Sequence, residues 1–420
     1  MPKYARLKGT QDILPVEQPY WEHLRMRVAE IARAYGFERI DTPIFELTEL
    51  FNRGVGDATD IVEKEMYAFK DRGGNEIALR PEFTAGVMRA YIENGMQVLP
   101  KPVKLYSIGP IFRHEQPQAG RYRQFHQFNA EILGVQDPLA DLEIMLLAWD
   151  IYDSLGFQSL AFQVHSTGCP ICRPQYVSLL AEHYRAHADA ICDDCKRRVA
   201  VNPLRVLDCK QPQCQPIIAG APKMLEHLCG ECAAHFTKLR GYLEHLGKPH
   251  TINPRLVRGL DYYTKTVFEV WAEGIGAQAA VCGGGRYDGL IELLGGHPTP
   301  GVGFAAGMER AVMVMQAQHI AVPPLPAPLV FIAFLGDATA RHAAQLLRAL
   351  RQAGLGAQIA MGGSLRSQLR QADKSAARFT LIVGEDEIAQ DVVTLRDMAT
   401  GEQETAPLNG VAQTIVERLG

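Results

Sequence analysis

The spacing of apolar residues predicts helices and strands in turn along the chain. Leu24, Val28 and Ile31 recur at helical spacing and predict a helix over residues 20–35, which Gly36 ends. The same patterns predict further helices over residues 84–94, 138–155, 338–354 and 364–372. They predict strands over residues 39–44, 76–82, 266–271, 277–282, 329–335, 357–360 and 379–383.

Residues 102–113 and 122–133 are the clearest pair of predicted strands. Both segments are rich in β-branched and aromatic residues, and the polar segment between them contains Pro117 and Gly120. Two such runs joined by a polar loop with proline and glycine predict an antiparallel hairpin.

Changes in composition divide the chain into five parts. Residues 1–168 and 236–320 carry the strand pattern, and residues 169–235 interrupt it with a cysteine-rich, mostly helical insertion. Residues 321–328 are rich in proline and predict a stiff linker. Strands and helices alternate over residues 329–420, which predicts a small α/β domain with a parallel or mixed sheet.

Charge and hydropathy exclude two broad classes of protein. Lysine and arginine number 43 against 47 aspartates and glutamates, so the formal net charge is −4, and a globally basic nucleic-acid binder is excluded. No apolar run approaches the roughly 18–20 residues that span a bilayer. The first residues carry charge without an apolar core behind them, so we expect no secretory signal and a cytoplasmic protein.

The predicted hairpin carries side chains that suit substrate binding. Strand side chains alternate between faces, so Gln127 and Glu131 belong to the same face of the sheet. Arg113 lies on the partner strand, and its planar guanidinium binds two phosphate oxygens at once. Gln127 and Glu131 suit an ammonium group or an imidazole N–H. A solvated polar face is the alternative, but the density of charge on this β-rich run favours a site.

Arg258 precedes Gly259, which allows a ligand to approach the backbone closely. Tyr262 and Tyr263 follow and can wall an aromatic pocket. The alternative is a turn whose tyrosines pack in the core.

Two further glycine motifs follow. The glycines at 283–285 come after a predicted strand and predict a turn that presents main-chain N–H groups to a ligand, or a flexible hairpin turn without one. Over residues 301–310 a strand runs through glycines into a helix. This connection places Arg310 where it can bind a phosphate, although a plain strand–helix connection would look the same.

Eight of the nine cysteines lie between residues 169 and 232. They form the pairs Cys169/Cys172, Cys192/Cys195, Cys209/Cys214 and Cys229/Cys232. Closely spaced pairs are the usual halves of tetrahedral zinc sites, so four pairs predict two structural Zn²⁺ ions. Reduced free thiols are an alternative, and so are disulfides, which a cytoplasmic compartment disfavours. One arrangement joins the two outer pairs in one site and the two inner pairs in the other.

Together and in this order, these motifs resemble those of the histidyl-tRNA synthetases, which are class II aminoacyl-tRNA synthetases. The segments that resemble class II motifs 1, 2 and 3 are residues up to Pro43, Phe112–Glu115 and Gly307–Arg310. The segments that resemble the signatures of the histidine enzymes are Arg255–Tyr263 and Gly284–Leu290. The resemblance implies an α+β fold: the class II antiparallel sheet flanked by helices, with a helical insertion module and a C-terminal α/β anticodon-binding domain.

The resemblance also implies a two-step ligation. The carboxylate of L-histidine attacks ATP, accompanied by Mg²⁺, to give histidyl-adenylate and pyrophosphate. The histidyl group then passes to the histidine tRNA, and AMP is released. Carried over residue by residue, the ATP-binding residues are Arg113, Arg258 and Arg310, with Arg113 and Arg258 catalytic. The histidine-binding residues are Glu82, Thr84, Gln127, Glu131, Tyr262, Tyr263 and Tyr287.

The resemblance further implies tRNA contacts and a homodimer. Arg121 and Arg123, in the predicted hairpin loop, are expected to contact the acceptor end. In the C-terminal domain Arg366 and Arg370 begin a four-residue repeat of cations that continues through Lys374 and Arg378. If helical, these residues form one basic stripe for the tRNA backbone, with a solvated face as the alternative.

Two rival functions differ in class. Relatives of this catalytic domain serve as histidine-sensing regulatory subunits of ATP phosphoribosyltransferase and generally lack the anticodon-binding domain, which this chain has. An RNA-binding module with a zinc clasp would leave the pocket of tyrosines and glutamate unexplained.

Overall fold

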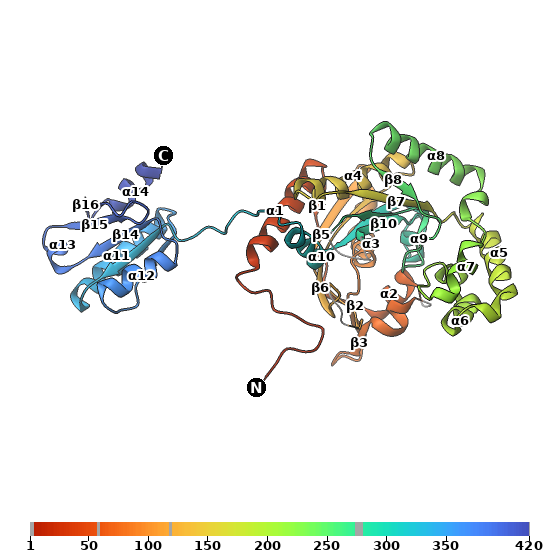
Figure 1. The fold of residues 1–420 in the computed structure, drawn as a ribbon, viewed down its shortest axis with the longest axis horizontal. Helices are drawn as coiled ribbons and strands as arrows, with labels where there is room; N and C mark the ends of the chain where they lie inside the picture. Colours follow the sequence, from red (N-terminus) through yellow and green to blue (C-terminus); the bar gives the residue numbers. More distant parts are fainter. Residues whose placement is uncertain (1–3, 57–58, 117–119, 274–279, 420) are drawn as a thin grey trace. The chain divides into compact units, whose positions relative to one another are not determined.

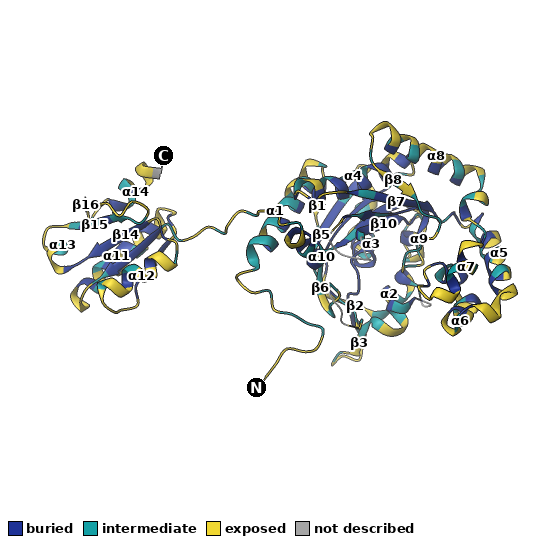
Figure 2. Cartoon of the chain, in the orientation of Figure 1, coloured by how far each residue is buried: buried dark blue, intermediate teal, exposed yellow. Residues whose placement is uncertain are grey.

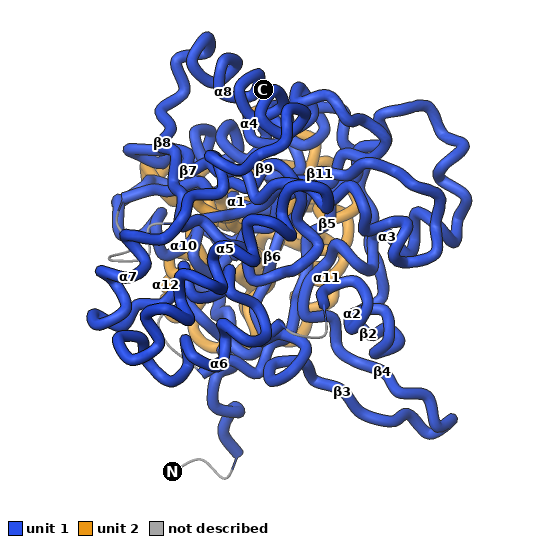
Figure 3. Tube along the Cα trace, turned by 90° about the vertical axis from the view of Figure 1, so that its right-hand side faces the viewer, with its two compact units in different colours: residues 1–323 blue, residues 324–420 orange. Residues whose placement is uncertain are grey.

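The computed structural model divides into two compact units, residues 1–323 and residues 324–420 (Figure 3). It describes residues 4–56, 59–116, 120–273 and 280–419. The boundary between the units falls within the proline-rich residues 321–328. Among the described residues, every helix is too short or too polar to cross a bilayer.

An eight-stranded sheet forms the centre of the first unit (Figure 1). In spatial order its strands are β1 (Glu38–Arg39), β5 (Val103–Phe112), β6 (Gln124–Leu133), β11 (Gly301–Gly307), β10 (Ala280–Arg286), β9 (Thr264–Trp271), β7 (Ala161–Ser166) and β8 (His250–Ile252). The pairs β1–β5 and β7–β8 are parallel and the other neighbours are antiparallel. The predicted hairpin is confirmed, because β5 and β6 pair along their whole length.

Helices cover one face of this sheet. The register places Phe304 and Phe268 on either side of Gly284, on the same face as Ala130. These residues pack in one buried core with residues of α1 (Gln18–Ala34), α4 (Pro138–Ser154), α8 (Gly230–His245) and α10 (Met308–Ala317). Figure 2 shows the sheet buried beneath the exposed outer turns of the helices. The opposite face carries Gln127, Asn129 and Glu131 and is the polar one.

The rest of the first unit consists of a small second sheet with its neighbouring helices and of the cysteine-rich segment. A small sheet contains β2 (Phe45–Leu47), β4 (Glu76–Leu79) and β3 (Tyr67–Lys70), and the neighbouring helices are α2 (Thr48–Val55), α3 (Thr84–Glu93) and α9 (Leu290–Leu293). The cysteine-rich segment contains α5 (Arg173–Ala186), α6 (Asp193–Val201) and α7 (Gln215–Ala219), which confirms its predicted helical character. It has a buried core of its own, built from Tyr176, Leu180 and the cysteines.

The strand predicted over residues 39–44 forms only in its first part. β1 ends at Arg39, and Ile40 is the last residue that bonds to β5, through its N–H to the Tyr106 carbonyl at 2.9 Å. The carbonyl groups of Thr42 and Pro43 instead accept hydrogen bonds from the Arg80 guanidinium, at 2.8 and 3.4 Å. A side chain distant in sequence therefore takes the place of a strand partner. Of the strand predicted over 277–282, residues 277–279 lie outside the described residues.

The second unit has the predicted mixed α/β fold. Its sheet contains, in spatial order, β13 (Ala357–Ile359), β12 (Val330–Phe334), β14 (Phe379–Val383), β15 (Val392–Asp397) and β16 (Gln403–Pro407). Its helices are α11 (Asp337–Gln352), α12 (Leu365–Lys374), α13 (Glu385–Ala389) and α14 (Val411–Leu419). The first three strands are parallel and the last two antiparallel.

The predicted basic stripe in this unit is shorter than expected. Arg366 and Arg370 are exposed on α12, which ends at Lys374. The chain then turns at Ala376, whose φ is +54°, so Arg378 lies outside the helix. The stripe over four helical cations is therefore wrong, and α12 carries only the first three.

A buried ion pair ties α4 to β10 in the first unit. Arg286 and Asp141 are both fully buried, and the Arg286 Nε atom donates to Asp141 Oδ2 at 3.0 Å. His235 on α8 lies 3.3 Å from the same carboxylate. Burial would raise the pKa of Asp141, but the charges and hydrogen bonds of Arg286 and His235 hold it below the ordinary value. This network joins three elements around one carboxylate.

We expect Asp141→Ala to destabilise the first unit by about 3–5 kcal/mol, because it leaves the Arg286 charge buried without its partner. Differential scanning calorimetry of the full chain measures this as a lower transition temperature of that unit. The control is Glu30→Ala, which removes the half-exposed ion pair with Arg27 and should cost about 1 kcal/mol at most. Equal shifts in the two variants would contradict the role of the network.

Candidate active site

Glycines in β10 and β11 make room for large polar side chains on the polar face of the sheet. A Cβ atom at Gly303 would overlap the Glu131 carboxylate, and one at Gly283 would lie 2.5 Å from Arg258 Cζ. The turn predicted at residues 283–285 is therefore wrong, because these glycines lie inside β10. Their function in the fold is to let side chains lie flat against the strands.

Glu131 is at the centre of a buried network on this face. Its side chain is 1% exposed and accepts hydrogen bonds from Thr84 Oγ1 at 2.8 Å, from Asn129 Nδ2 at 3.0 Å and from the Tyr287 hydroxyl. Burial raises the pKa of Glu131 to about 7, although these three donors favour the charged form. A carboxyl with this pKa can accept a hydrogen bond from, or donate one to, a bound nitrogen near neutral pH.

Glu82 holds the start of α3. Its two carboxylate oxygens accept the backbone N–H groups of Thr84, at 2.6 Å, and Ala85, at 2.7 Å. These N–H groups belong to the first helical turn, which has no backbone acceptors of its own. Glu82 therefore fixes the position of Thr84, and Thr84 in turn contacts Glu131.

Three tyrosines line the space beside Glu131. The ring centroids of Tyr262 and Tyr263 are 4.7 Å apart, and those of Tyr262 and Tyr287 are 5.6 Å apart. Tyr287 lies against Gly301, where a Cβ atom would overlap its ring. The three phenol rings and Glu131 form an enclosed group on the sheet, and Arg286, next to Tyr287, anchors one side of it through Asp141.

The three arginines predicted to bind ATP line one cavity of about 500 Å³. Arg113 enters it from the end of the hairpin, Arg258 from the loop before β9, and Arg310 from α10. Gln127 lines the same cavity. Arg121, Arg198 and Arg205 line it as well, and a cavity of this size with six arginines is suited to a polyphosphate.

Each arginine of the cavity is held by a neighbour. The Arg113 Nε atom donates to the Pro81 carbonyl at 2.8 Å, and Arg310 Nη1 donates to the Ala280 carbonyl at 2.7 Å. In the described part of the chain, the buried Nε of Arg258 and the buried Oε1 of Gln127 have no hydrogen-bond partner. Buried polar atoms usually have a partner, so these two atoms mark positions where a bound ligand would supply one.

Sequence reasoning did not identify Glu269, which lines this cavity. Glu269 Oε1 accepts from Arg258 Nη1 at 2.6 Å, and its Oε2 accepts from the Trp271 indole at 2.9 Å. Glu269 lies directly across from Gly283 in the register. The sequence does show that Glu269 and Trp271 lie on the same face of one strand. Their contact with Arg258, however, depends on the pairing of β9 with β10, which the sequence does not show.

The residues predicted to bind histidine and those predicted to bind ATP lie on neighbouring rows of one sheet face. Glu131 is across from Gly303, which pairs with Gly285. The neighbouring row of paired residues on the same face contains Ala305 and Gly283, and Arg258 lies over Gly283. Glu131 does not line the large cavity. A smaller cavity, lined by Arg258 and Tyr263, lies against Asn202 and Arg205 of the cysteine-rich insertion. The face therefore holds both groups side by side.

The residues predicted to contact tRNA occupy different surroundings. Arg121 lines the large cavity and pairs with Glu115 at 3.2 Å. Arg123 lies beside it and donates to the Glu115 carbonyl at 3.5 Å. Arg366 and Arg370 are exposed on α12 of the second unit.

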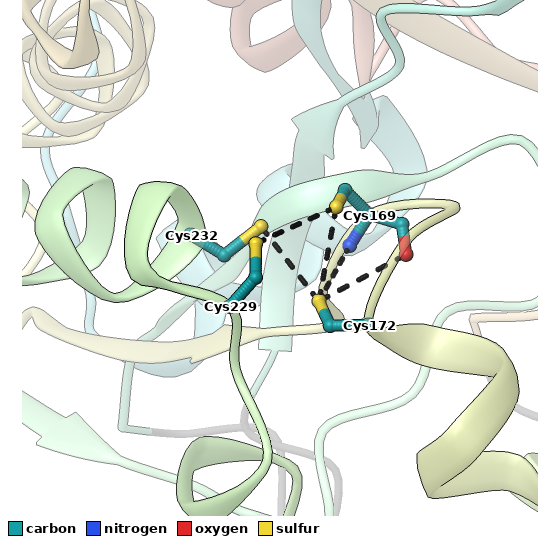
Figure 4. A group of neighbouring side chains, drawn as sticks. All are labelled: Cys169, Cys172, Cys229 and Cys232. Atoms are coloured by element: carbon teal, nitrogen blue, oxygen red, sulfur yellow. Dashed lines mark hydrogen bonds between the residues drawn. The ribbon is translucent and has the colours of Figure 1, made fainter.

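The eight clustered cysteines form two groups of four. One contains Cys169, Cys172, Cys229 and Cys232 (Figure 4), and the other contains Cys192, Cys195, Cys209 and Cys214. Within each group all Sγ atoms lie within 4.8 Å of one another, and the closest pairs are 3.8 Å apart. Zn–S bonds of about 2.3 Å in a tetrahedron imply Sγ–Sγ distances of about 3.8 Å. The geometry fits zinc, and the outer pairs group together, as do the inner pairs.

Comparison with known proteins agrees with this geometry. A family model described as histidyl-tRNA synthetase matches residues 9–169 and 217–311, and one described as anticodon binding domain matches residues 329–418. The segment between the two parts of the first match contains α6 and the inner cysteines.

Relatives and solved structures match over nearly the full chain. The histidine–tRNA ligase of Pelotomaculum thermopropionicum is 49% identical over 416 residues, which cover 99% of this chain and 98% of the relative. That of Desulfitobacterium hafniense is 49% identical over 414 residues, covering 98% of each. The crystal structure of apo S. aureus histidyl-tRNA synthetase is 36% identical with a TM-score of 0.82, covering 98% of this chain and 99% of that one. The chain therefore belongs to the histidyl-tRNA synthetase family and is an aminoacyl-tRNA synthetase, a ligase.

Proposed function

We propose that the chain joins L-histidine to the histidine tRNA in two steps, through a histidyl-adenylate. The first step consumes ATP and releases pyrophosphate, and the second releases AMP. The observation that carries this proposal is the common sheet face, which holds a buried carboxyl with three tyrosines beside a cavity lined by six arginines, Arg113, Arg258 and Arg310 among them. Bond formation between an amino acid and a nucleotide requires two such sites in contact.

The arginines supply charge where the transition state needs it. When the histidine carboxylate attacks the α-phosphorus, negative charge increases on the phosphoryl oxygens. Arg258 is held by Glu269 over Gly283 with its Nε unpaired among the described residues, so it can meet that charge without rearrangement. Arg113 and Arg310 are assigned to the other phosphates. Mg²⁺ enters with the nucleotide, and Glu115, Glu269 and Glu309 offer oxygen ligands in the cavity.

The enclosed group around Glu131 is assigned to the imidazole. Its carboxyl, with a pKa of about 7, can pair with an imidazole N–H. Tyr263, with Tyr262 and Tyr287 beside it, supplies the second polar contact and the walls. Gln127, with its unpaired Oε1, faces the amino-acid backbone, and Glu82 and Thr84 lie on the α-amino side. An analogue without the imidazole nitrogens would leave these buried groups unpaired, which discriminates by about 10⁴-fold or more.

The remaining assignments follow the family. We propose that Arg121 and Arg123 contact the acceptor end of the tRNA, and that Arg366 and Arg370 of the anticodon-binding domain contact its backbone. We also propose a cytoplasmic homodimer. Exposed apolar side chains on β2, Phe45 at 58% and Leu47 at 57%, support a surface that another copy covers.

We propose that each group of four cysteines holds one structural Zn²⁺ ion. Sγ–Sγ distances of 3.8 Å fit a tetrahedron of thiolates around zinc and are far longer than the roughly 2.05 Å of a disulfide bond. When bound, zinc would stabilise the small cysteine-rich core.

We expect ATP–pyrophosphate exchange that depends on L-histidine. The purified chain should exchange labelled pyrophosphate into ATP with histidine and at background level with the other amino acids. A histidine sensor or an RNA-binding module would bind its ligand without exchange. Exchange driven by another amino acid would contradict the substrate assignment.

Arg258→Ala should lower the rate of adenylate formation by at least ~10²-fold, because one preorganised transition-state donor is lost. Stopped-flow or exchange kinetics measure the rate at saturating histidine. Arg255→Ala is the matched control, since Arg255 lies three residues away and donates to Gln215 at the protein surface. A loss of histidine affinity with unchanged turnover would refute this role of Arg258.

Elemental analysis should find about two zinc atoms per chain, one for each group of four cysteines. Cys192→Ser together with Cys195→Ser should leave about one. A fully active sample that contains no metal would rule out the zinc sites.

A further inference from the structure

A short segment of the cysteine-rich insertion reaches the large cavity. Residues 202–208 contain the 3₁₀ turn η4 (Pro203–Val206), and Arg205 and Asp208 from this segment line the cavity. Val206, fully buried in the core of the insertion, anchors the turn, and the Val206 carbonyl accepts from the Cys209 N–H at 3.0 Å. The inner cysteines therefore hold the segment that presents Arg205.

Arg205 bridges from the insertion to the catalytic sheet region. Its Nη2 atom lies 2.7 Å from Oδ2 of Asp60. Its Nη1 atom lies 3.5 Å from the position that a Cβ atom at Gly259 would occupy. Gly259 directly follows Arg258, so the guanidinium packs over the backbone that carries the proposed transition-state donor.

A second contact holds the same loop. Asn202 Nδ2 donates to Asp261 Oδ1 at 3.2 Å. On its other side the Asp261 N–H donates to the Val55 carbonyl at 3.2 Å, and the Asp261 side chain lies against Gly56. Residues 258–261 are thus held between the insertion and the end of α2. Through these contacts the inner cysteines are linked to the loop that carries Arg258. The described residues show no hydrogen bond between Arg258 itself and the insertion.

We propose that Arg205 is a positioning residue for histidine activation, and that the inner group of four cysteines sets its position. The inference rests on the proposed function of Arg258. Arg205 pairs with Asp60 and packs on Gly259, and this arrangement holds the Arg258 backbone at the distance at which its guanidinium lies over Gly283. Loss of the arrangement lets the loop shift, and a shift of about 1 Å at a catalytic group costs up to about 10²-fold in rate.

The ion pair itself contributes little to global stability. The Arg205 side chain is 22% exposed and that of Asp60 is 40% exposed, and solvent screens such partly exposed pairs so that they add little to stability. Changes at Arg205 should therefore lower the rate of adenylate formation while leaving the unfolding temperature nearly unchanged. A lower rate of adenylate formation with an unchanged unfolding temperature distinguishes a positioning residue from one that only stabilises the fold.

The test compares charge variants in histidine-dependent ATP–pyrophosphate exchange. Arg205→Ala and Asp60→Asn should each lower kcat about 10-fold or more with a smaller effect on the KM for histidine. The double variant Arg205→Asp with Asp60→Arg should recover part of the loss, since it restores the pair with reversed charges. Lys196→Ala is the control, because it removes a cation from α6 that pairs only with Asp193 among the described residues.

Hydrogen exchange gives a readout that is independent of activity. In Arg205→Ala, amides of residues 258–261 should exchange faster, and those of α11 in the second unit should not change. Cys209→Ser with Cys214→Ser, which removes the inner site, should increase exchange in the same loop and lower kcat to the same degree.

Three results would overturn the inference or a part of it. An active wild-type enzyme with an Arg205→Ala variant of equal kcat would refute the positioning role and leave the proposed function intact. Wild-type protein without histidine-dependent exchange would refute both. A cysteine variant with one metal, full activity and an unchanged loop would refute the part assigned to the inner cysteines.

Discussion

The site depends on charged side chains that lie close against the backbone of the sheet, at positions where glycines leave no Cβ atom in the way. Arg258 lies over Gly283, and the Glu131 carboxylate occupies the space that a side chain at Gly303 would need. Strands usually lose stability where glycine replaces a residue that packs. Here the loss is offset because the other face of the same strands belongs to a continuous apolar core with four helices. The working side of the sheet, which carries these charged groups, is shared between the polar groups of the site and a second apolar cluster, in which Leu105 and Val267 pack with residues of α3.

Buried charges on the working side are held by partners from distant parts of the chain. Arg286 is anchored by Asp141 of α4, and its neighbour Tyr287 donates to Glu131. Arg258 is anchored by Glu269, which Trp271 orients. A buried charge without a partner is costly, so each anchor also restricts where its partner can lie. The result is a set of groups whose positions are fixed before any substrate arrives.

The cysteine-rich insertion contacts the loop over residues 255–263 at several places, including the Asn202–Asp261 and Arg255–Gln215 hydrogen bonds. Arg173, next to Cys172, donates to the carbonyl of Tyr263, and Arg205 packs over Gly259. Both contacts reach the loop between Arg255 and Tyr263. A small core with two proposed metal sites therefore forms part of the wall around the proposed reaction centre, in addition to any contact with tRNA.

The amino-acid sequence by itself determined the hairpin, the helical insertion, the mixed C-terminal sheet, the grouping of cysteines by spacing and the family resemblance. These depend on local periodicity and on residue types at short separation, which a chain displays directly. It did not determine that Gly283–Gly285 lie inside a strand, that Thr42 and Pro43 bond to Arg80, that Glu269 bonds to Arg258, or that Arg205 lies against Gly259. Each of these depends on which strands and segments become neighbours. Only the tertiary structure decides that, because the register of β9, β10 and β11 is fixed by the packing of the whole sheet on its helices.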